Sequence, residues 1–271
     1  MSSCRLKRYS SYAVAALIAC LPWFAIPRSV AAVQTPETLT PSQREIQKQQ
    51  DRLGSSSDED RRDAVMLLGA MHLPEASRVA ARTLTDGSAK VRAVAAKAVV
   101  YLPAGESVPL LLPVLQDRDE FVRREAVYAL GLTHSRSATA AVVDRLLNDK
   151  EDGVRAAAAV ALADIADETS VVTLSTVLTG QAKRKGKPER NDFVLRAAAT
   201  ALGHIRSPAG VPALVTTLRN EKLSSDVRRE AATALGTIGD PTAIDALNQA
   251  VNSPDPYLSR IAFESLKKIS R

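Results

Sequence analysis

The three histidines are the first residues to consider for chemistry, because an imidazole can bind a metal ion or transfer a proton near neutral pH. They are His72, His134 and His204. None belongs to a His-Glu motif or to the H-E-x-x-H pattern that places two metal ligands on one helical face. We therefore predict that the chain has no metal site and that these histidines lie in turns or on the surface.

Other signatures of catalysis are also missing from the sequence. It contains no glycine-rich phosphate loop, no nucleophile elbow and no paired-carboxylate pattern. Both cysteines, Cys4 and Cys20, fall within the first 32 residues. A chain cleaved after that segment would have no thiol for a disulfide, a zinc site or a nucleophile. We expect neither catalytic activity nor a cofactor.

One cluster of cations is dense enough to attract a ligand. The segment QAKRKGKPERN (181–191) interrupts the chain with five cations and a single acidic residue, Glu189. The cations are Lys183, Arg184, Lys185, Lys187 and Arg190. One interpretation is a solvated loop between two structural units. The other is a contact for an acidic protein or an anionic lipid surface, because loops on rigid scaffolds often carry function.

The first 32 residues have the layout of a secretory signal peptide. A basic start precedes the apolar run YAVAALIACLPWFAI (12–26), and the small residues SVAA (29–32) follow. The run is broken by Pro22 and is shorter than the ~20 apolar residues of a membrane-spanning helix. We expect export to a bacterial periplasm or cell envelope, with no transmembrane segment in the mature chain. A lipid anchor on Cys20 is the weaker alternative, because the apolar run continues past it.

The same segment carries most of the excess positive charge. The whole chain has 36 basic and 30 acidic residues, a net charge of +6. Residues 1–32 contain four basic residues and no acidic ones, so the mature chain would have a net charge of +2. General nucleic-acid binding requires many more cations. We therefore expect a protein partner and no nucleic acid.

An internal repeat accounts for most of the chain. The segments FVRREAVYALG (121–131) and DVRREAATALG (226–236) are nearly the same, and related segments recur every 31 to 40 residues. An alanine stands three places after each reference position, and an apolar residue stands seven places after it. This spacing puts the apolar residues on one face of a helix. The reference positions, aligned on the first arginine of VRREA, are Arg61, Arg92, Arg123, Arg155, Leu195, Arg228 and Ser259.

Each repeat continues through a turn into a second apolar helix. A two-helix unit of about 31 residues cannot bury its own apolar faces, so neighbouring units must stack. The alanine in each first helix lets neighbouring helices approach to the lower end of the roughly 8–10 Å range. The sequence thus predicts an all-α solenoid over residues 57–271. It is preceded at 33–56 by a linker and a mostly polar segment, which is either an N-terminal cap helix or the partner helix of an incomplete first repeat.

The repeat pattern D-x-x-x-x-V-R-x-x-A-x-x-A-L-G-x-I is seen at 117–131 and again, from its valine onward, at 227–238. It resembles HEAT repeats, in particular the short class named after phycobilisome bilin lyases. The resemblance implies about six two-helix repeats plus a terminal helix, and a ladder of arginine–aspartate ion pairs along the stack. The ladder residues are Asp86, Arg92, Asp117, Arg123, Asp149, Arg155 and Arg228, with interruptions at Leu195 and Ser259.

We conclude from the sequence that the chain is an exported, non-catalytic scaffold that binds another protein. The second helices are expected to line its concave surface. Phe121, Phe193 and Tyr257 share the position two before the reference and are expected to pack onto the neighbouring hairpin. The alternative implied by the resemblance is a bilin-lyase-like or lyase-accessory protein that handles a chromophore.

Overall fold

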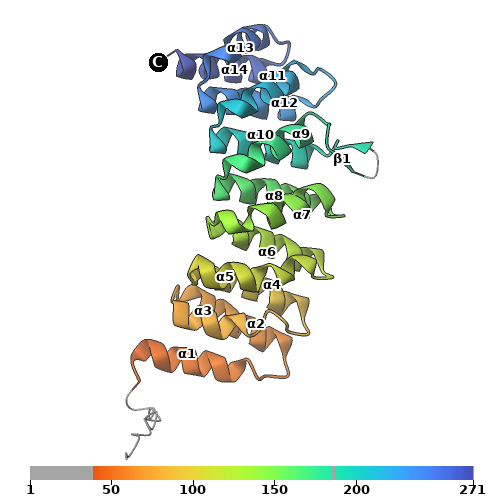
Figure 1. Cartoon of the computed structure of the whole chain (residues 1–271). Coiled ribbons are helices and arrows are strands. Elements are labelled where there is room, and N and C mark those ends of the chain that lie inside the picture. Colours follow the sequence, from red (N-terminus) through yellow and green to blue (C-terminus); the bar gives the residue numbers. More distant parts are fainter. Residues whose placement is uncertain (1–38, 185–186, 271) are drawn as a thin grey trace, which may run out of the picture. The chain divides into compact units, whose positions relative to one another are not determined.

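The computed structural model describes residues 39–184 and 187–270. The leader expected at 1–32, with Cys20, and residues 33–38 of the expected linker lie outside the described residues. Thr40–Arg271 forms one compact unit. This unit is an array of stacked helical hairpins (Figure 1). The prediction of an all-α solenoid is therefore confirmed.

Helices alternate regularly along this array. The first helices, which carry the reference positions, are α2 (Asp58–Ala70), α4 (Ala89–Ala98), α6 (Glu120–Leu132), α8 (Asp152–Ile165), α10 (Asp192–Ile205), α12 (Ser225–Ile238) and α14 (Pro256–Ile269). The second helices are α3 (Pro74–Ala81), α5 (Ala104–Leu111), α7 (Thr139–Asn148), α9 (Val171–Leu178), α11 (Val211–Arg219) and α13 (Ile244–Val251). Helix α1 (Pro41–Arg52) comes before them all, and the hairpin strands β1 (Lys183–Arg184) and β2 (Lys187–Pro188) separate α9 from α10.

Helix α1 starts where the sequence supplies a capping box. The Thr40 hydroxyl accepts a hydrogen bond from the Gln43 N–H at 3.2 Å, and the Gln43 side chain accepts one from the Thr40 N–H at 2.9 Å. Gln49 is the one residue of α1 that is fully buried. A mostly polar helix is what the end of a stacked array needs. It lies within the segment where the sequence predicts a cap helix.

The first helices pack close together, because a glycine of one helix faces a small residue of the next at the α2–α4, α6–α8, α10–α12 and α12–α14 steps. A methyl group added to Gly131 of α6 would lie only 2.8 Å from the Cα of Ala161 in α8. A methyl group on Gly203 would lie 3.0 Å from the Cα of Ala234. The core behind them is continuous, with leucines such as Leu130 fully buried. Helix backbones can approach this closely only where the contact residues are alanine or glycine.

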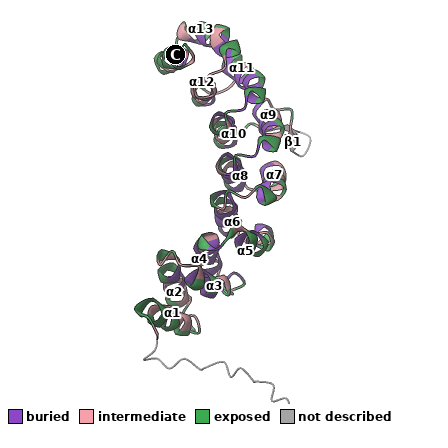
Figure 2. Ribbon diagram, turned by 60° about the vertical axis from the view of Figure 1, so that its left-hand side comes forward, coloured by how far each residue is buried: buried purple, intermediate pink, exposed green. Residues whose placement is uncertain are grey.

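The first helices lie closer to one another than the second helices do, and this decides which row lies inside the bend of the array. Each first helix packs extensively on the next, whereas the second helices touch one another sparsely. Figure 2 shows the first helices on the inner side of the curve and the second helices on the outer side. The expectation that second helices line the concave surface is therefore wrong. The first helices line it, since the row with the smaller side chains must follow the shorter arc.

Candidate interaction surfaces

The predicted ladder residues form ion pairs between consecutive repeats. Both nitrogens of one guanidinium edge meet both oxygens of a carboxylate in Arg92–Asp117 (2.6 and 2.8 Å) and in Arg123–Asp149 (2.8 and 2.9 Å). Arg61, a reference position outside the predicted ladder, forms the same pair with Asp86 at 2.8 Å. Such two-point pairing fixes direction as well as distance.

Each ladder arginine also binds the loop before its own helix. The remaining nitrogen of Arg92 donates to the backbone carbonyl of Asp86 at 2.9 Å, and that of Arg123 donates to the carbonyl of Asp117 at 2.9 Å. One guanidinium therefore joins two successive loops. The hydrogen bonds from Arg61 and Arg92 lower the pKa values of Asp86 and Asp117 below the ordinary range.

Asp149 is the most buried carboxylate of the ladder, with 3% of its surface exposed. Burial alone would raise its pKa, but the hydrogen bonds from Arg123 and from the Glu151 N–H outweigh burial and leave the pKa lowered. Asp149 is thus held as an anion inside the protein. Its partner Arg123 is 5% exposed.

The acid at the fourth step of the ladder is Glu189, the single acidic residue of the basic segment and not one of the predicted ladder residues. Arg155 lies 2.9 Å from the Glu189 carboxylate and 2.6 Å from Asp152. Glu189 also accepts the N–H of Asn191, as each ladder aspartate accepts the N–H two residues on. Its spacing in the sequence indicates that Glu189 is a ladder residue. Glu189 stands six residues before the next reference position, as Asp86, Asp117 and Asp149 do.

Beyond Glu189 the ladder stops. The next reference position is Leu195, and Lys222 stands six residues before the reference position after it, where an acid would be needed. Asn220, two residues earlier, accepts the Lys222 N–H at 3.1 Å. Arg228 was predicted as a ladder member, and this is wrong. Its side chain donates to the Leu218 carbonyl at 3.0 Å and has no ion pair within residues 39–184 and 187–270. The physical reason is that Ser253 replaces the acid it would need.

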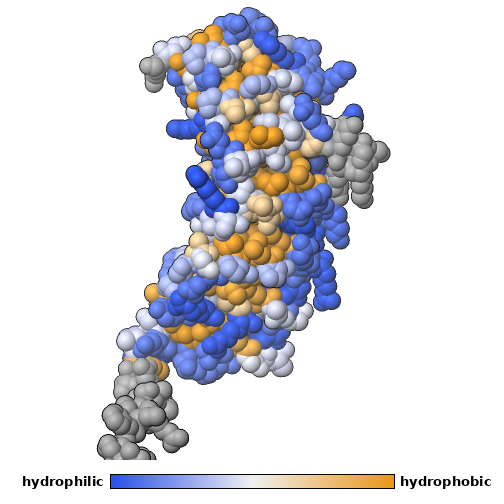
Figure 3. All heavy atoms as spheres, viewed as in Figure 1, coloured by the Kyte–Doolittle hydropathy of each residue, from blue (hydrophilic) through white to orange (hydrophobic). Residues whose placement is uncertain are grey.

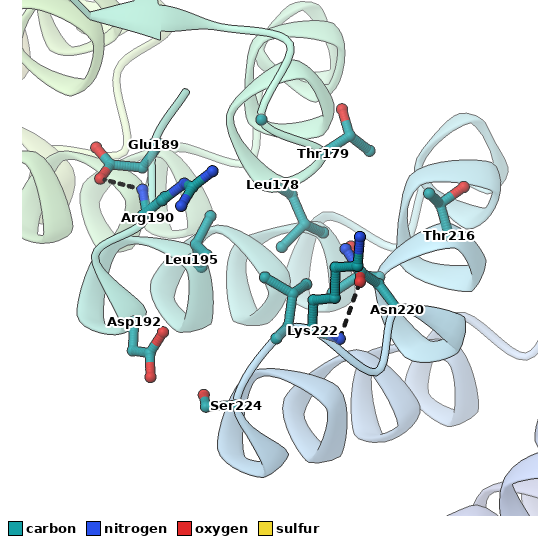
Figure 4. A pocket seen from close by; sticks show the side chains of 13 residues that line it. Leu178, Thr179, Glu189, Arg190, Asp192, Leu195, Thr216, Asn220, Lys222 and Ser224 are labelled. Carbon is teal, nitrogen blue, oxygen red and sulfur yellow. Dashed lines mark hydrogen bonds between the residues drawn. The ribbon is translucent and has the colours of Figure 1, made fainter. Parts of the chain in front are cut away.

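A pocket of about 500 Å³ opens where the ladder stops, between α9, α10 and α11. Leu178 and Leu195 form its apolar wall, and Arg190 and Lys222 stand on either side (Figure 4). Its other lining residues are mostly uncharged and polar: Thr179, Gly180, Glu189, Asp192, Thr216, Thr217, Asn220, Leu223 and Ser224. Leu195 stands where the preceding repeats have a ladder arginine, and its shorter side chain leaves open the space that a guanidinium would occupy beside the next loop.

The basic insertion begins beside this pocket. Its backbone forms the β1–β2 hairpin, in which Lys183 pairs with Pro188 and Arg184 with Lys187. Lys185, and the side chains of Lys183, Arg184 and Lys187, lie outside the described residues. Arg190 is exposed. The contact predicted for these five cations therefore stays a prediction.

A second surface lies on the inner face, which we define as the exposed side of the first helices. Large apolar side chains are exposed here in the first four repeats, at five of the eight positions that stand five or nine after a reference; the other three hold Ala70, Lys97 and Asp164. They are Met66 (53% exposed), Tyr101 (40%), Tyr128 (36%), Leu132 (53%) and Val160 (38%), and we call them the inner apolar patch. The same two positions in the last three repeats hold Thr200, His204, Thr233, Thr237, Glu264 and Lys268.

A small recess extends the inner apolar patch between α2 and α4. It has a volume of about 210 Å³ and is lined by Met66, Gly69, His72, Lys97 and Tyr101, among others. The rings of His72 and Tyr101 contact each other at a tilt of 30°, with centroids 4.3 Å apart. The recess is smaller than the roughly 300 Å³ at which small-molecule pockets begin, and it suits a single inserted side chain.

The remaining candidate residues lie on the surface. His72 and His134 occupy left-handed turn positions, with φ of 54° and 50°. Among the described residues, no group of three His, Cys, Asp or Glu side chains could hold a metal ion. Phe121, Phe193 and Tyr257 are 43%, 73% and 67% exposed, so they are not buried against neighbouring hairpins as expected. The Tyr257 ring does contact the preceding repeat, since the Arg229 guanidinium of α12 lies 5.0 Å from its centroid.

Comparison with known families identifies the repeat. A family model described as HEAT repeats matches residues 77–163 and 188–267. The resemblance drawn from the sequence is confirmed at the level of this repeat. No curated protein matches the sequence. In the described part of the chain, no helix has the length and apolar character needed to cross a membrane.

Solved structures share the fold at low sequence identity. The Escherichia coli protein YibA aligns with a TM-score of 0.57 and 17% identity, covering 84% of this chain and 81% of that one. An engineered protein aligns with a TM-score of 0.52 and 22% identity, covering 83% and 68%. The complex of CpcE and CpcF of phycocyanin lyase from Nostoc gives a TM-score of 0.49 and 23% identity, covering 86% and 89%. These likenesses concern the fold alone.

Proposed function

Because this chain belongs to the HEAT-repeat family, we propose that it is a non-catalytic scaffold that binds another protein on its inner face. The observation that carries the proposal is the inner apolar patch. Five large apolar side chains are exposed on neighbouring first helices, while the same positions in later repeats are polar. Contiguous exposed apolar surface on a soluble protein marks interaction sites.

The inner face is also a rigid platform. The ladder ties together the loops of the first four repeats, which are the repeats that carry the patch. Side chains held on a stiff array lose little conformational freedom when a partner binds. The recess beside Tyr101 would take one side chain of that partner.

The test compares two matched double variants. Leu132→Ser/Val160→Ser alters the patch, and Leu110→Ser/Val172→Ser alters exposed residues of the second helices. Figure 3 shows that apolar residues also form a broken band on the face viewed there, so this control is needed. Proteins captured by the wild type and by the control, but lost with the patch variant, support the proposal. Equal capture by both variants contradicts it, provided that the thermal unfolding curve of each variant shows that it is folded.

We further propose that the protein acts outside the cytoplasm, in a bacterial periplasm or envelope. The support is the sequence of residues 1–32, with its basic start, interrupted apolar run and small residues. Mass spectrometry of the N-terminus of native protein tests this. Cleavage near Ala31 or Ala32 is expected, whereas an intact leader contradicts it, and a lipidated Cys20 would favour the anchored form.

The bilin-lyase alternative has a direct test of its own. Incubation with a free bilin and an acceptor protein would produce a lasting change in visible absorbance if the chain handled a chromophore. We expect no change.

A further inference from the structure

Three first helices begin with the same small motif. The segments FVRR (121–124), FVLR (193–196) and YLSR (257–260) each place an aromatic residue two before the reference and an arginine one after it. They belong to α6, α10 and α14, which are alternate first helices. Residues three apart on a helix are neighbours on its surface. This spacing puts one ring and one arginine on the same stretch of helix surface in each motif.

These side chains are available on the inner face. Phe121, Phe193 and Tyr257 are 43%, 73% and 67% exposed. The guanidinium of Arg124 lies over the Phe121 ring, 4.9 Å from its centroid. Arg196 and Arg260 are exposed. One side of the Tyr257 ring is covered by the guanidinium of Arg229 from α12, 5.0 Å from the ring centroid.

The three arginines also differ from those at the same position in other repeats. Arg62 pairs with Glu59 and Asp63, and Arg229 pairs with Asp226 and Asp255. Arg124, Arg196 and Arg260 form no ion pair with any residue that the structure describes. A guanidinium next to an exposed ring is suited to a carboxylate whose neighbouring side chain is apolar, because the ring buries apolar surface while the guanidinium binds both oxygens.

The spacing of the motifs fixes the shape of the ligand. Neighbouring helices in such arrays lie roughly 8–10 Å apart, so alternate first helices lie roughly 16–20 Å apart. An extended polypeptide advances about 3.3 Å per residue, so about five or six residues would separate the groups that reach successive motifs.

We propose that Arg124, Arg196 and Arg260, with their neighbouring rings, bind an extended polypeptide segment that carries a carboxylate beside an apolar residue at intervals of five or six positions. This inference rests on the proposed function and names the chemistry of the partner. A dense polyanion fits less well, because Glu120 and Asp192 stand beside the motifs and would repel closely spaced phosphates.

The test is fluorescence anisotropy with labelled synthetic peptides of roughly 15 residues. One peptide has Glu-Leu pairs about six residues apart, and a second has the same composition with the pairs about three apart. We expect the first to bind at least about tenfold more tightly, and Arg124→Gln/Arg196→Gln/Arg260→Gln to lose about tenfold in affinity for it. The control Arg82→Gln/Arg118→Gln/Arg136→Gln has the same net charge and alters exposed arginines outside the motifs. It should bind as the wild type does.

Three results would overturn the inference: no preference between the peptides, equal loss in both triple variants, or tighter binding of a single-stranded oligonucleotide by the same arginines. Failure here is separable from failure of the proposed function. If neither peptide binds but capture still depends on Leu132 and Val160, the scaffold proposal stands and only the acidic-segment inference is wrong.

Discussion

The Arg123–Asp149 pair is the residue-level feature on which the array depends most. Both partners are nearly buried, and the guanidinium also holds the Asp117 carbonyl. Breaking a buried pair by removing one partner leaves an unpaired charge, which costs about 3–5 kcal/mol. Asp149→Asn should therefore lower the free energy of unfolding by about 3 kcal/mol or more.

The chain itself supplies the control for this prediction. One step beyond Glu189 the ladder arginine is replaced by Leu195, and the side chain that accepts the N–H two residues on, as the ladder aspartates do, is that of the uncharged Asn220. Arg123→Leu/Asp149→Asn copies that arrangement and removes the buried guanidinium of Arg123, while Arg145, which lies 3.5 Å from Asp149, keeps its pair with Asp144. The loss of unfolding free energy in urea should therefore be smaller for the double variant than for Asp149→Asn. A double variant that is less stable than the single one would contradict this account.

The ladder carboxylates also predict the response of the array to acid. The pKa values of Asp86, Asp117 and Asp149 are lowered in the folded protein. Their contribution to stability is therefore complete above the unfolded-state pKa of about 3.9 and is lost as the pH falls through the folded-state values. The Tm should fall steeply below about pH 4, and less steeply in Arg123→Leu/Asp149→Asn. If the Tm fell equally steeply with pH in the two proteins, the ladder would not be the cause of the acid sensitivity.

At the scale of the helix, close approach within the first row is the central feature. Gly131→Ala would place a methyl group 2.8 Å from the Ala161 backbone, which cannot move aside as a flexible side chain can. We expect a loss of about 1–3 kcal/mol in unfolding free energy. Gly105→Ala is the matched control, since nothing lies within 4 Å of the added methyl, and it should stabilise α5 by about 0.5–1 kcal/mol. A neutral Gly131→Ala would mean that the helices can separate without cost.

The sequence was sufficient to predict the helices and their stacking, because an alanine and an apolar residue recur at fixed places in every repeat. It was not sufficient to predict which row lies inside the bend. That depends on the backbone distances at Gly131 and Gly203, where the absence of a side chain lets the next helix approach closely. The role of Glu189 was hidden by the insertion before it, and the Arg228 assignment failed because its partner position holds a serine.

At the scale of the whole array, two halves differ in their chemistry. The first four repeats combine the ion-pair ladder with the inner apolar patch. After Glu189 the ladder stops, the pocket at Leu195 opens, and the inner face becomes polar except for Phe193, Tyr257 and Phe263. A partner that binds along the inner face would thus be anchored by apolar contacts at one end and aligned by the aromatic–arginine motifs toward the other.

The most direct test of protein binding on the inner face is site-specific photo-crosslinking in cells that produce the protein naturally. A photoreactive amino acid would replace Leu132 on the inner face in one variant and Val172 on a second helix in the other; both positions are at least half exposed. We predict a discrete crosslinked protein from position 132 and none from position 172. No product at position 132, or the same product from both positions, would contradict the account.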